Sequence, residues 1–219
     1  LNNPDVALEA DADSPESLYN ATYRKFADQK YAEALSDLDT YIDRFYGDAY
    51  VPKFELLKAT ILGRYKGYAA YKEAMNFVSV TYPRSDEGKK AQALLQTSIP
   101  AMEFKSFEDE SAAKNYKLLY AFSSSETEQA VDLKKRLEEA FEIVGYTEFA
   151  VSIDTYSENQ MFVVVHYLSD RLRAEGLAEM LQINDDIRIT HPSLAISSGN
   201  YKIVQIHKNV KAYEEQFIN

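Results

Sequence analysis

The chain has 219 residues, a formal net charge of −11 at pH 7, and neither cysteine nor tryptophan. Both halves are acidic and offer no basic surface for a phosphate backbone, so nucleic acid is not an expected partner. Without cysteine there are no disulfides, thiolate metal sites or thiol nucleophiles, and no apolar run is long enough to span a bilayer.

The chain begins at Leu1 without a signal peptide or a lipidation cysteine, and we interpret it as a mature or excised fragment. Residues 1–13 are acidic and poor in apolar side chains, which indicates a solvated lead-in. Ser14 followed by Pro15 predicts an N-cap and the first position of a helix, because the donor that proline lacks is unused at that position.

From Pro15 to about Ile99 the apolar residues recur with the period of an α-helix. Glycine, proline and polar clusters interrupt this pattern at four places. The breaks predict five helices, over about 15–28, 30–46, 51–66, 68–82 and 84–103.

Two stretches of this region resemble each other at a spacing of 36–37 residues. An aromatic residue followed by small residues opens a helix at Lys30–Ala34 and again at Gly67–Tyr71, and aromatic-rich turns follow at Tyr41–Tyr46 and Phe77–Pro83. Helix pairs of about 34 residues are typical of tetratricopeptide repeats, which stack because one pair cannot bury its own apolar faces. We therefore predict tetratricopeptide-like helical repeats over residues 14–103. A plain antiparallel helical bundle is the alternative.

The pattern changes after residues 104–114, which are polar and irregular and are predicted to be a linker. Tyr116–Phe122 then predicts a strand. Ser125, with Glu128 three residues later, predicts a capping box that opens a helix, and Gly145 is expected to end that helix.

Alternating apolar residues over Glu148–Tyr156 predict a half-buried strand, and Met161–Leu168 predicts the second strand of a hairpin. Asp170 is expected to cap a helix that runs to about Gln182, and Ser193–Ser197 to form a short strand. The resulting order, β-α-β-β-α-β, is the split arrangement of ferredoxin-like folds.

The segment Tyr201–Ile206 fits a strand or a helix equally well. After it, Val210, Tyr213 and Phe217 lie three and four positions apart, which predicts a C-terminal helix whose apolar stripe docks onto the rest of the chain. The predicted fold class is therefore α+β, with the ferredoxin-like domain and this helix together occupying residues 115–219.

Chemistry-bearing motifs are absent from the sequence. It contains no GxSxG elbow and no glycine-rich phosphate loop, and it has only 7 glycines. The histidines, His166, His191 and His207, fall in three separate elements without metal-ligand spacing, and His166 is expected to fill a strand face. We therefore expect no enzymatic activity, metal, cofactor or small-molecule substrate.

Ten of the 17 tyrosines lie between Tyr19 and Tyr82. Most are expected to pack between helices. Aromatic residues on the first helix of each pair, which lines the inner surface of stacked repeats, are candidates for partner binding because a tyrosine offers rigid contact area and a hydroxyl. The predicted partner-binding residues are Tyr19, Tyr23, Phe26, Phe54, Lys58 and Tyr65.

Segments of the second half are similar to the C-terminal region of the PorW/SprE-like tetratricopeptide-repeat lipoproteins of Bacteroidota. Ile196–Tyr201 resembles an ISxxNY segment of that family, Lys208–Phe217 resembles its closing KxxxxYxxxF segment, and Tyr116–Phe122 is also similar. The resemblance implies a scaffold of type IX secretion and gliding motility in the periplasm, associated with the outer membrane through a lipid anchor upstream of Leu1. Its expected partners are other secretion-system proteins, and the family brings no catalytic residues.

Two functions therefore follow from the sequence. The first is a non-enzymatic protein–protein interaction scaffold in the bacterial envelope. The alternative is a peptidoglycan-binding envelope protein, since small β-α-β-β-α-β domains that follow repeats also serve glycan recognition.

Overall fold

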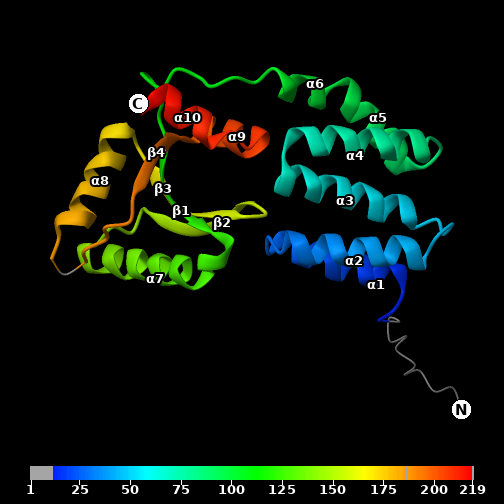
Figure 1. Ribbon diagram of the computed structural model, residues 1–219, viewed down its shortest axis with the longest axis horizontal. Coiled ribbons are helices and arrows are strands. Elements are labelled where there is room, and N and C mark those ends of the chain that lie inside the picture. The colour runs from blue at the N-terminus through cyan, green and yellow to red at the C-terminus, as the bar shows by residue number, and fades with distance from the viewer. Residues whose placement is uncertain (1–11, 186, 219) are drawn as a thin grey trace, which may run out of the picture. The chain divides into compact units, whose positions relative to one another are not determined.

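The computed structural model describes residues 12–185 and 187–218, so nearly all of the expected lead-in lies outside the described residues. The chain divides into two compact units, one made only of helices and one built around a sheet (Figure 1). The first unit holds the chain up to Arg64 together with Tyr68–Glu103, and the second holds Tyr65–Gly67 and Phe104–Asn219. Within the described ranges, none of the helices is both long and apolar enough to cross a membrane.

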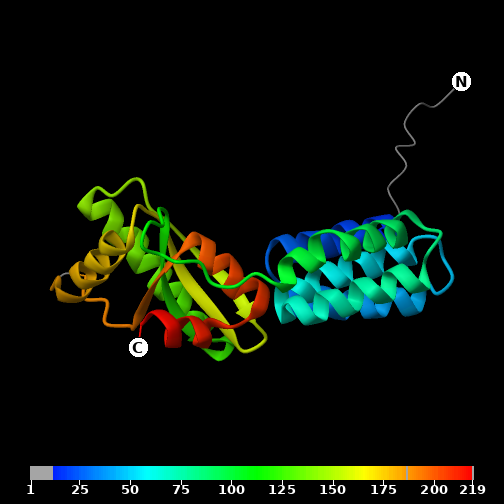
Figure 2. The same ribbon diagram turned by 90° about the horizontal axis from the view of Figure 1, so that it is seen from above.

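The first unit consists of helices that run side by side (Figure 2). They are α1 (Pro15–Ala27), α2 (Tyr31–Arg44), α3 (Val51–Lys66), α4 (Tyr68–Thr81), α5 (Asp86–Gln96) and α6 (Ser98–Glu103). The predicted N-cap at Ser14 is confirmed, because the Ser17 N–H donates to the Ser14 Oγ over 3.3 Å. Ala34 and Ala91 have no exposed surface, and their small side chains let neighbouring helices approach closely.

The fifth predicted helix is wrong in one respect, because it is divided at Thr97. The Thr97 N–H bonds back to the Leu94 carbonyl, which tightens the end of α5, and α6 begins at the next residue. Pro100 gives the physical reason. It has no N–H to donate to the Gln96 carbonyl, and its ring would clash with that carbonyl in an uninterrupted helix.

The second unit carries a four-stranded antiparallel sheet with the strand order β2-β3-β1-β4. Its elements are β1 (Tyr116–Ser123), the 3-10 turn η1 (Ser124–Glu126), α7 (Thr127–Val144), β2 (Ala150–Ser157), β3 (Gln160–Leu168), α8 (Arg171–Ile183), β4 (Ser193–Ser197), α9 (Ser198–His207) and α10 (Val210–Phe217). The predicted α+β class, β2–β3 hairpin and C-terminal helix are confirmed.

Helices cover both faces of this sheet, α7 and α8 on one side and α9 and α10 on the other (Figure 1). Side chains alternate between the two cores, so Leu118 packs toward α7 and α8 while Leu119 packs toward α9 and α10. The segment Phe162–Val165 of β3 is wholly buried for this reason, since a strand covered on both faces needs apolar residues at every position. The undecided segment Tyr201–Ile206 belongs to α9, and Tyr213 docks as expected, with no exposed surface.

The capping box lies two residues earlier than predicted. Ser123 and Glu126 form it, with the Ser123 N–H donating to the Glu126 Oε2 over 2.8 Å, whereas Ser125 and Glu128 do not. The 3-10 turn η1 causes the difference. It follows β1 directly, so the chain already turns at Ser124, before α7 begins at Thr127. Gly145 ends α7 as predicted, in the left-handed conformation at φ +80°.

Candidate interaction surface

An aromatic cluster organises the first unit around Phe54 of α3. The ring centroids of Tyr19, Tyr41, Phe45 and Tyr50 lie between 5.7 and 6.3 Å from the centroid of Phe54. Because these rings come from α1, α2 and the turn between α2 and α3, Phe54 of α3 ties the first three helices together. It has no exposed surface.

On the outer side of this cluster, α1 presents an aromatic strip. Tyr19, Tyr23 and Phe26 are four and three positions apart, so they share one face of the helix. The rings of Tyr19 and Tyr23 stack with centroids 6.3 Å apart, and those of Tyr23 and Phe26 meet edge to face at 5.8 Å. Tyr23 is 50% exposed, so at least half of it contributes nothing to the core.

A cation lies beside this strip. The Lys53 Nζ is 5.4 Å from the centre of the Tyr19 ring and 4.7 Å from that of Tyr50, and it donates to the Tyr50 hydroxyl over 3.3 Å. Burial raises the pKa of Tyr19, and the nearby negative charge of Glu87 on α5 adds to that rise. Side chains of α1 and of the start of α3, with Tyr50 just before it, therefore share one surface. We call Tyr19, Tyr23, Phe26, Tyr50 and Lys53 the aromatic surface.

The six predicted partner-binding residues do not all lie there. Tyr19, Tyr23 and Phe26 belong to the aromatic surface, but Phe54 is the buried centre of the cluster beneath it and offers no surface to a partner. Tyr65 is buried at 8% exposure and is grouped with the second unit.

Lys58 forms an ion pair with Asp39 of α2, with a distance of 2.6 Å between Nζ and Oδ1. Tyr50 and Lys53 were missed by the sequence analysis. Their spacing of three at the start of a helix was the available signal, because it places them on the same side.

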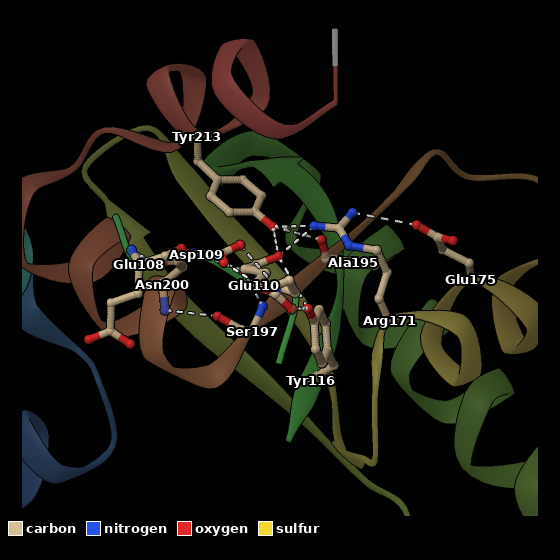
Figure 3. A network of polar contacts seen from close by, with 11 residues as sticks. Glu108, Asp109, Glu110, Tyr116, Arg171, Glu175, Ala195, Ser197, Asn200 and Tyr213 are labelled. Atoms are coloured by element: carbon tan, nitrogen blue, oxygen red, sulfur yellow. Dashed lines mark hydrogen bonds and ion pairs between the residues drawn. The ribbon is translucent and has the colours of Figure 1, made fainter. Parts of the chain in front are cut away.

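The second unit contains a buried carboxylate, Glu110, that the sequence did not indicate (Figure 3). Its Oε1 accepts hydrogen bonds from the Ser197 N–H over 2.9 Å and from the Asn200 Nδ2 over 2.8 Å. Its Oε2 accepts from the Tyr213 hydroxyl over 2.9 Å and from the Arg171 guanidinium. One side chain therefore links α8, the β4–α9 junction and α10.

These donors keep Glu110 ionised. Burial alone would raise its pKa, but the hydrogen bonds from Ser197, Asn200 and Tyr213 outweigh burial and place the pKa below its usual value. Both carboxylate oxygens are occupied by partners, which leaves no free lone pair directed at a substrate. We therefore interpret Glu110 as a residue that holds elements of the second unit together, rather than as a general base.

The expected linker, residues 104–114, is grouped with the second unit, and part of it packs there. The Phe107 ring meets those of Tyr213 and Phe217 edge to face at 5.6 and 6.1 Å. The Glu108 N–H donates to the Asn200 Oδ1 over 2.8 Å, and the Asn200 Nδ2 donates back to the Glu108 carbonyl over 3.0 Å.

A second polar cluster lies between the sheet and α9. The His166 Nδ1 is 2.7 Å from the Lys117 Nζ, and the His166 Nε2 is 2.7 Å from the Ser152 Oγ. Ser152 donates to one Asp154 oxygen over 2.7 Å, and the Tyr201 hydroxyl donates to the other over 2.6 Å. The prediction that His166 fills a strand face is therefore incomplete, because its ring also bonds Lys117 and Ser152.

Proton positions argue against a nucleophilic role for Ser152. The Lys117 ammonium donates to Nδ1, so a neutral His166 carries its proton on Nε2 and donates to Ser152, whose own proton goes to Asp154. In a Ser-His-Asp triad the histidine must accept the serine proton and the aspartate must orient the histidine. Neither condition holds here.

This cluster predicts an acid-sensitive contribution to stability. Burial lowers the pKa of His166, and the charge of Lys117 lowers it further. The unfolded chain then binds a proton at a higher pH than the folded chain, so the free energy of unfolding falls as the pH drops below about 6.5. Urea unfolding between pH 8 and 5 should show a steeper decline in the wild type than in His166→Gln. His207→Gln, outside this cluster, is the control, and equal slopes for all three proteins would contradict the prediction.

Comparison with protein-family models and with curated proteins finds no match for this chain. Among residues 12–185 and 187–218, no three His, Asp or Glu side chains are grouped so that they could hold a metal ion. The fold defines an α+β protein with a helical unit and a helix-covered antiparallel sheet.

Proposed function

We propose that the chain is a non-enzymatic protein–protein interaction scaffold that binds its partner through the aromatic surface of the first unit. The half-exposed ring of Tyr23 is the observation that carries this proposal. Tyr19 and Phe26 hold that ring on either side, so it is presented to solvent in a fixed position. A rigid aromatic side chain loses little conformational entropy when a partner covers it, which is why tyrosine is common among residues that dominate binding energy.

Charge would add to the rate of binding rather than define its site. The chain has a net charge of −11, so long-range attraction favours a partner with a basic patch. Lys53 has a more local part, because it lies over two rings of the aromatic surface and offers a cation to a carboxylate or carbonyl of the partner.

We infer further that the two units are tetratricopeptide-like repeats and a ferredoxin-like domain. Support for the repeats comes from the equivalent starts of α2 and α4 at Tyr31 and Tyr68, 37 positions apart. Support for the ferredoxin-like assignment comes from the order β-α-β-β-α-β combined with the strand order β2-β3-β1-β4.

The resemblance to PorW/SprE-like lipoproteins extends the proposal to a biological setting. Asn200 and Tyr213 of the two similar segments both bond Glu110, which gives those segments a structural reason to recur together. The proposed setting is the periplasmic side of the outer membrane, with components of type IX secretion or gliding machinery as partners and a lipid upstream of the chain as the anchor.

A matched pair of substitutions tests the proposed surface. Tyr23 is 50% exposed on α1 and Phe77 is 49% exposed on α4, so each loses a similar aromatic surface on replacement by alanine. We expect Tyr23→Ala to weaken partner binding by about 1–2 kcal/mol, roughly 5- to 30-fold in affinity, and Phe77→Ala to leave it nearly unchanged. The measurement is recovery of partners with each purified variant from the envelope of the organism that encodes it, with folding checked by circular dichroism.

Three outcomes are informative. Equal recovery of the same proteins by both variants would remove the aromatic surface from the proposal. Recovery of no secretion component by the wild type would remove the proposed setting. Retention of the chain on isolated, protein-free sacculi would instead favour the peptidoglycan-binding alternative.

A further inference from the structure

A nearly buried carboxylate on α3 of the first unit is left without a bonding partner. Glu55 is 9% exposed, yet among the described residues it accepts no hydrogen bond and forms no ion pair. Withdrawing a carboxylate from water without a hydrogen bond is costly, and buried polar groups are nearly always bonded. The stability of the fold therefore gives no reason for a glutamate at this position.

A cation lies on the same helix, but it is paired elsewhere. Lys58, three positions after Glu55, places its Nζ 2.6 Å from the Asp39 Oδ1 on α2. Burial raises the pKa of Glu55, the charge of Lys58 lowers it in part, and Asp39 raises it again. The net effect is a raised pKa, so Lys58 does not offset the cost of burying this carboxylate.

Aromatic side chains lie near this carboxylate. Ala59, one turn after Glu55 on α3, belongs to a core against which Tyr82 packs. Burial raises the pKa of Tyr82, and the neighbouring charges of Glu55 and Tyr46 raise it further. Tyr46 follows α2 as Tyr82 follows α4, 36 positions later, and its side chain is 91% exposed. A carboxylate without a counter-charge therefore lies within electrostatic reach of two tyrosines from equivalent places in the unit.

This combination of groups suits a guanidinium. A carboxylate accepts two parallel N–H bonds from an arginine, and the faces of tyrosine rings attract the positive charge of the same group. A lysine ammonium is a point charge and lacks this planar match. The net charge of −11 also attracts a basic partner at long range.

We propose that Glu55 is the binding site for an arginine side chain of a partner protein, with Tyr82 and Tyr46 supporting the guanidinium. The site is separate from the aromatic surface. Glu55 lies two positions after Lys53, and a helix turns about 100° per residue, so the two side chains point to nearly opposite sides of α3. The assignment therefore stands whether or not the aromatic surface binds a partner.

Binding of a fluorescein-labelled hexa-arginine peptide to the full 219-residue chain tests the assignment. Fluorescence anisotropy measures the Kd at about 0.15 M salt, where exposed charges are largely screened. Glu55→Gln should raise the Kd by about tenfold, because it removes the charge-assisted pair. Glu73→Gln, at an exposed position of α4, makes the same change of charge and should raise the Kd by less than about twofold. Hexalysine should bind the wild type more weakly than hexa-arginine, and Glu55→Gln should reduce that preference.

Thermal unfolding separates this binding role from a structural one. Glu55→Gln removes an unpaired charge from a buried position, so it should raise the melting temperature of the free chain by about 2–4 °C while it weakens arginine binding. Equal weakening by Glu55→Gln and Glu73→Gln, or equal binding of hexa-arginine and hexalysine by the wild type, would overturn the proposal. A lower melting temperature for Glu55→Gln would also overturn it, because the fold itself would then need the carboxylate.

Discussion

Replacing Glu110 with alanine should lower the free energy of unfolding by about 3–5 kcal/mol, the range expected when one partner of a buried ion pair is removed. The substitution leaves the Arg171 guanidinium without its carboxylate. It also deprives the Ser197 N–H, the Asn200 amide and the Tyr213 hydroxyl of an acceptor. The side chain links three parts of the second unit, so its loss should release α10 together with the segment that contains Phe107.

Glu108 provides the matched control for this experiment. It has the same charge and lies two residues away, but its exposed side chain takes no part in the bonds with Asn200, which use the Glu108 backbone. We expect Glu108→Ala to cost under about 1 kcal/mol, as is usual for an exposed position. Denaturant unfolding of both variants at pH 7 is the measurement. A Glu110→Ala variant no less stable than Glu108→Ala would show that the network contributes little.

The stabilisation that Glu110 contributes to the wild type depends on pH. The pKa of folded Glu110 lies below its ordinary value of 4.5, so the stabilisation is present at higher pH. It is lost as the pH falls below about 4.5 and through the folded pKa, because the unfolded chain then binds the proton first. The difference in the free energy of unfolding between the wild type and Glu110→Ala should therefore become smaller in acid.

The second large effect is expected at Phe54. Phe54→Ala removes the ring that contacts Tyr19, Tyr41, Phe45 and Tyr50, and it should destabilise the helical unit by about 3–5 kcal/mol, because a buried phenylalanine leaves a cavity that the surroundings fill only in part. Loss of helical circular dichroism during urea titration measures it.

Phe77→Ala serves again as the control, since a ring that is 49% exposed loses less buried area and should cost roughly 1 kcal/mol. Equal effects of Phe54→Ala and Phe77→Ala would mean that Phe54 is not the centre of the cluster.

Local signals in the sequence predicted the secondary structure well. Ser193–Ser197 has the predicted bounds, and Gly145 ends α7 in the left-handed conformation that favours glycine. Such features depend on neighbouring residues only. The break at Thr97 was also local, and it could have been predicted from Pro100, which lacks the donor that a continuous helix needs there.

The contacts that hold the second unit together could not be predicted in this way. Tyr213 and Glu110 are separated by 103 positions, and nothing in the acidic stretch around Glu110 distinguishes a buried carboxylate from a solvated one. The covering of the second sheet face by α9 and α10 also depends on tertiary packing, because an apolar strand residue does not show which helix will cover it.

The candidate surface was predicted in part, for a geometric reason. On α1 the helical phase was right, and Tyr19, Tyr23 and Phe26 share a face. On α3 it was wrong at Phe54, and adjacent positions face different directions because a helix turns about 100° per residue. Lys53 is therefore on the surface while the predicted residue, Phe54, is in the core.

Site-specific photo-crosslinking tests the central claim most directly. A photoreactive phenylalanine analogue is placed at position 23 in one protein and at position 77 in another, and both are irradiated in cells of the organism that encodes the chain. Since the two positions are equally exposed, random encounters should label them equally. The proposed function predicts a discrete protein adduct at position 23 and little at position 77. Equal labelling at both positions, or an adduct at position 77 alone, would contradict it.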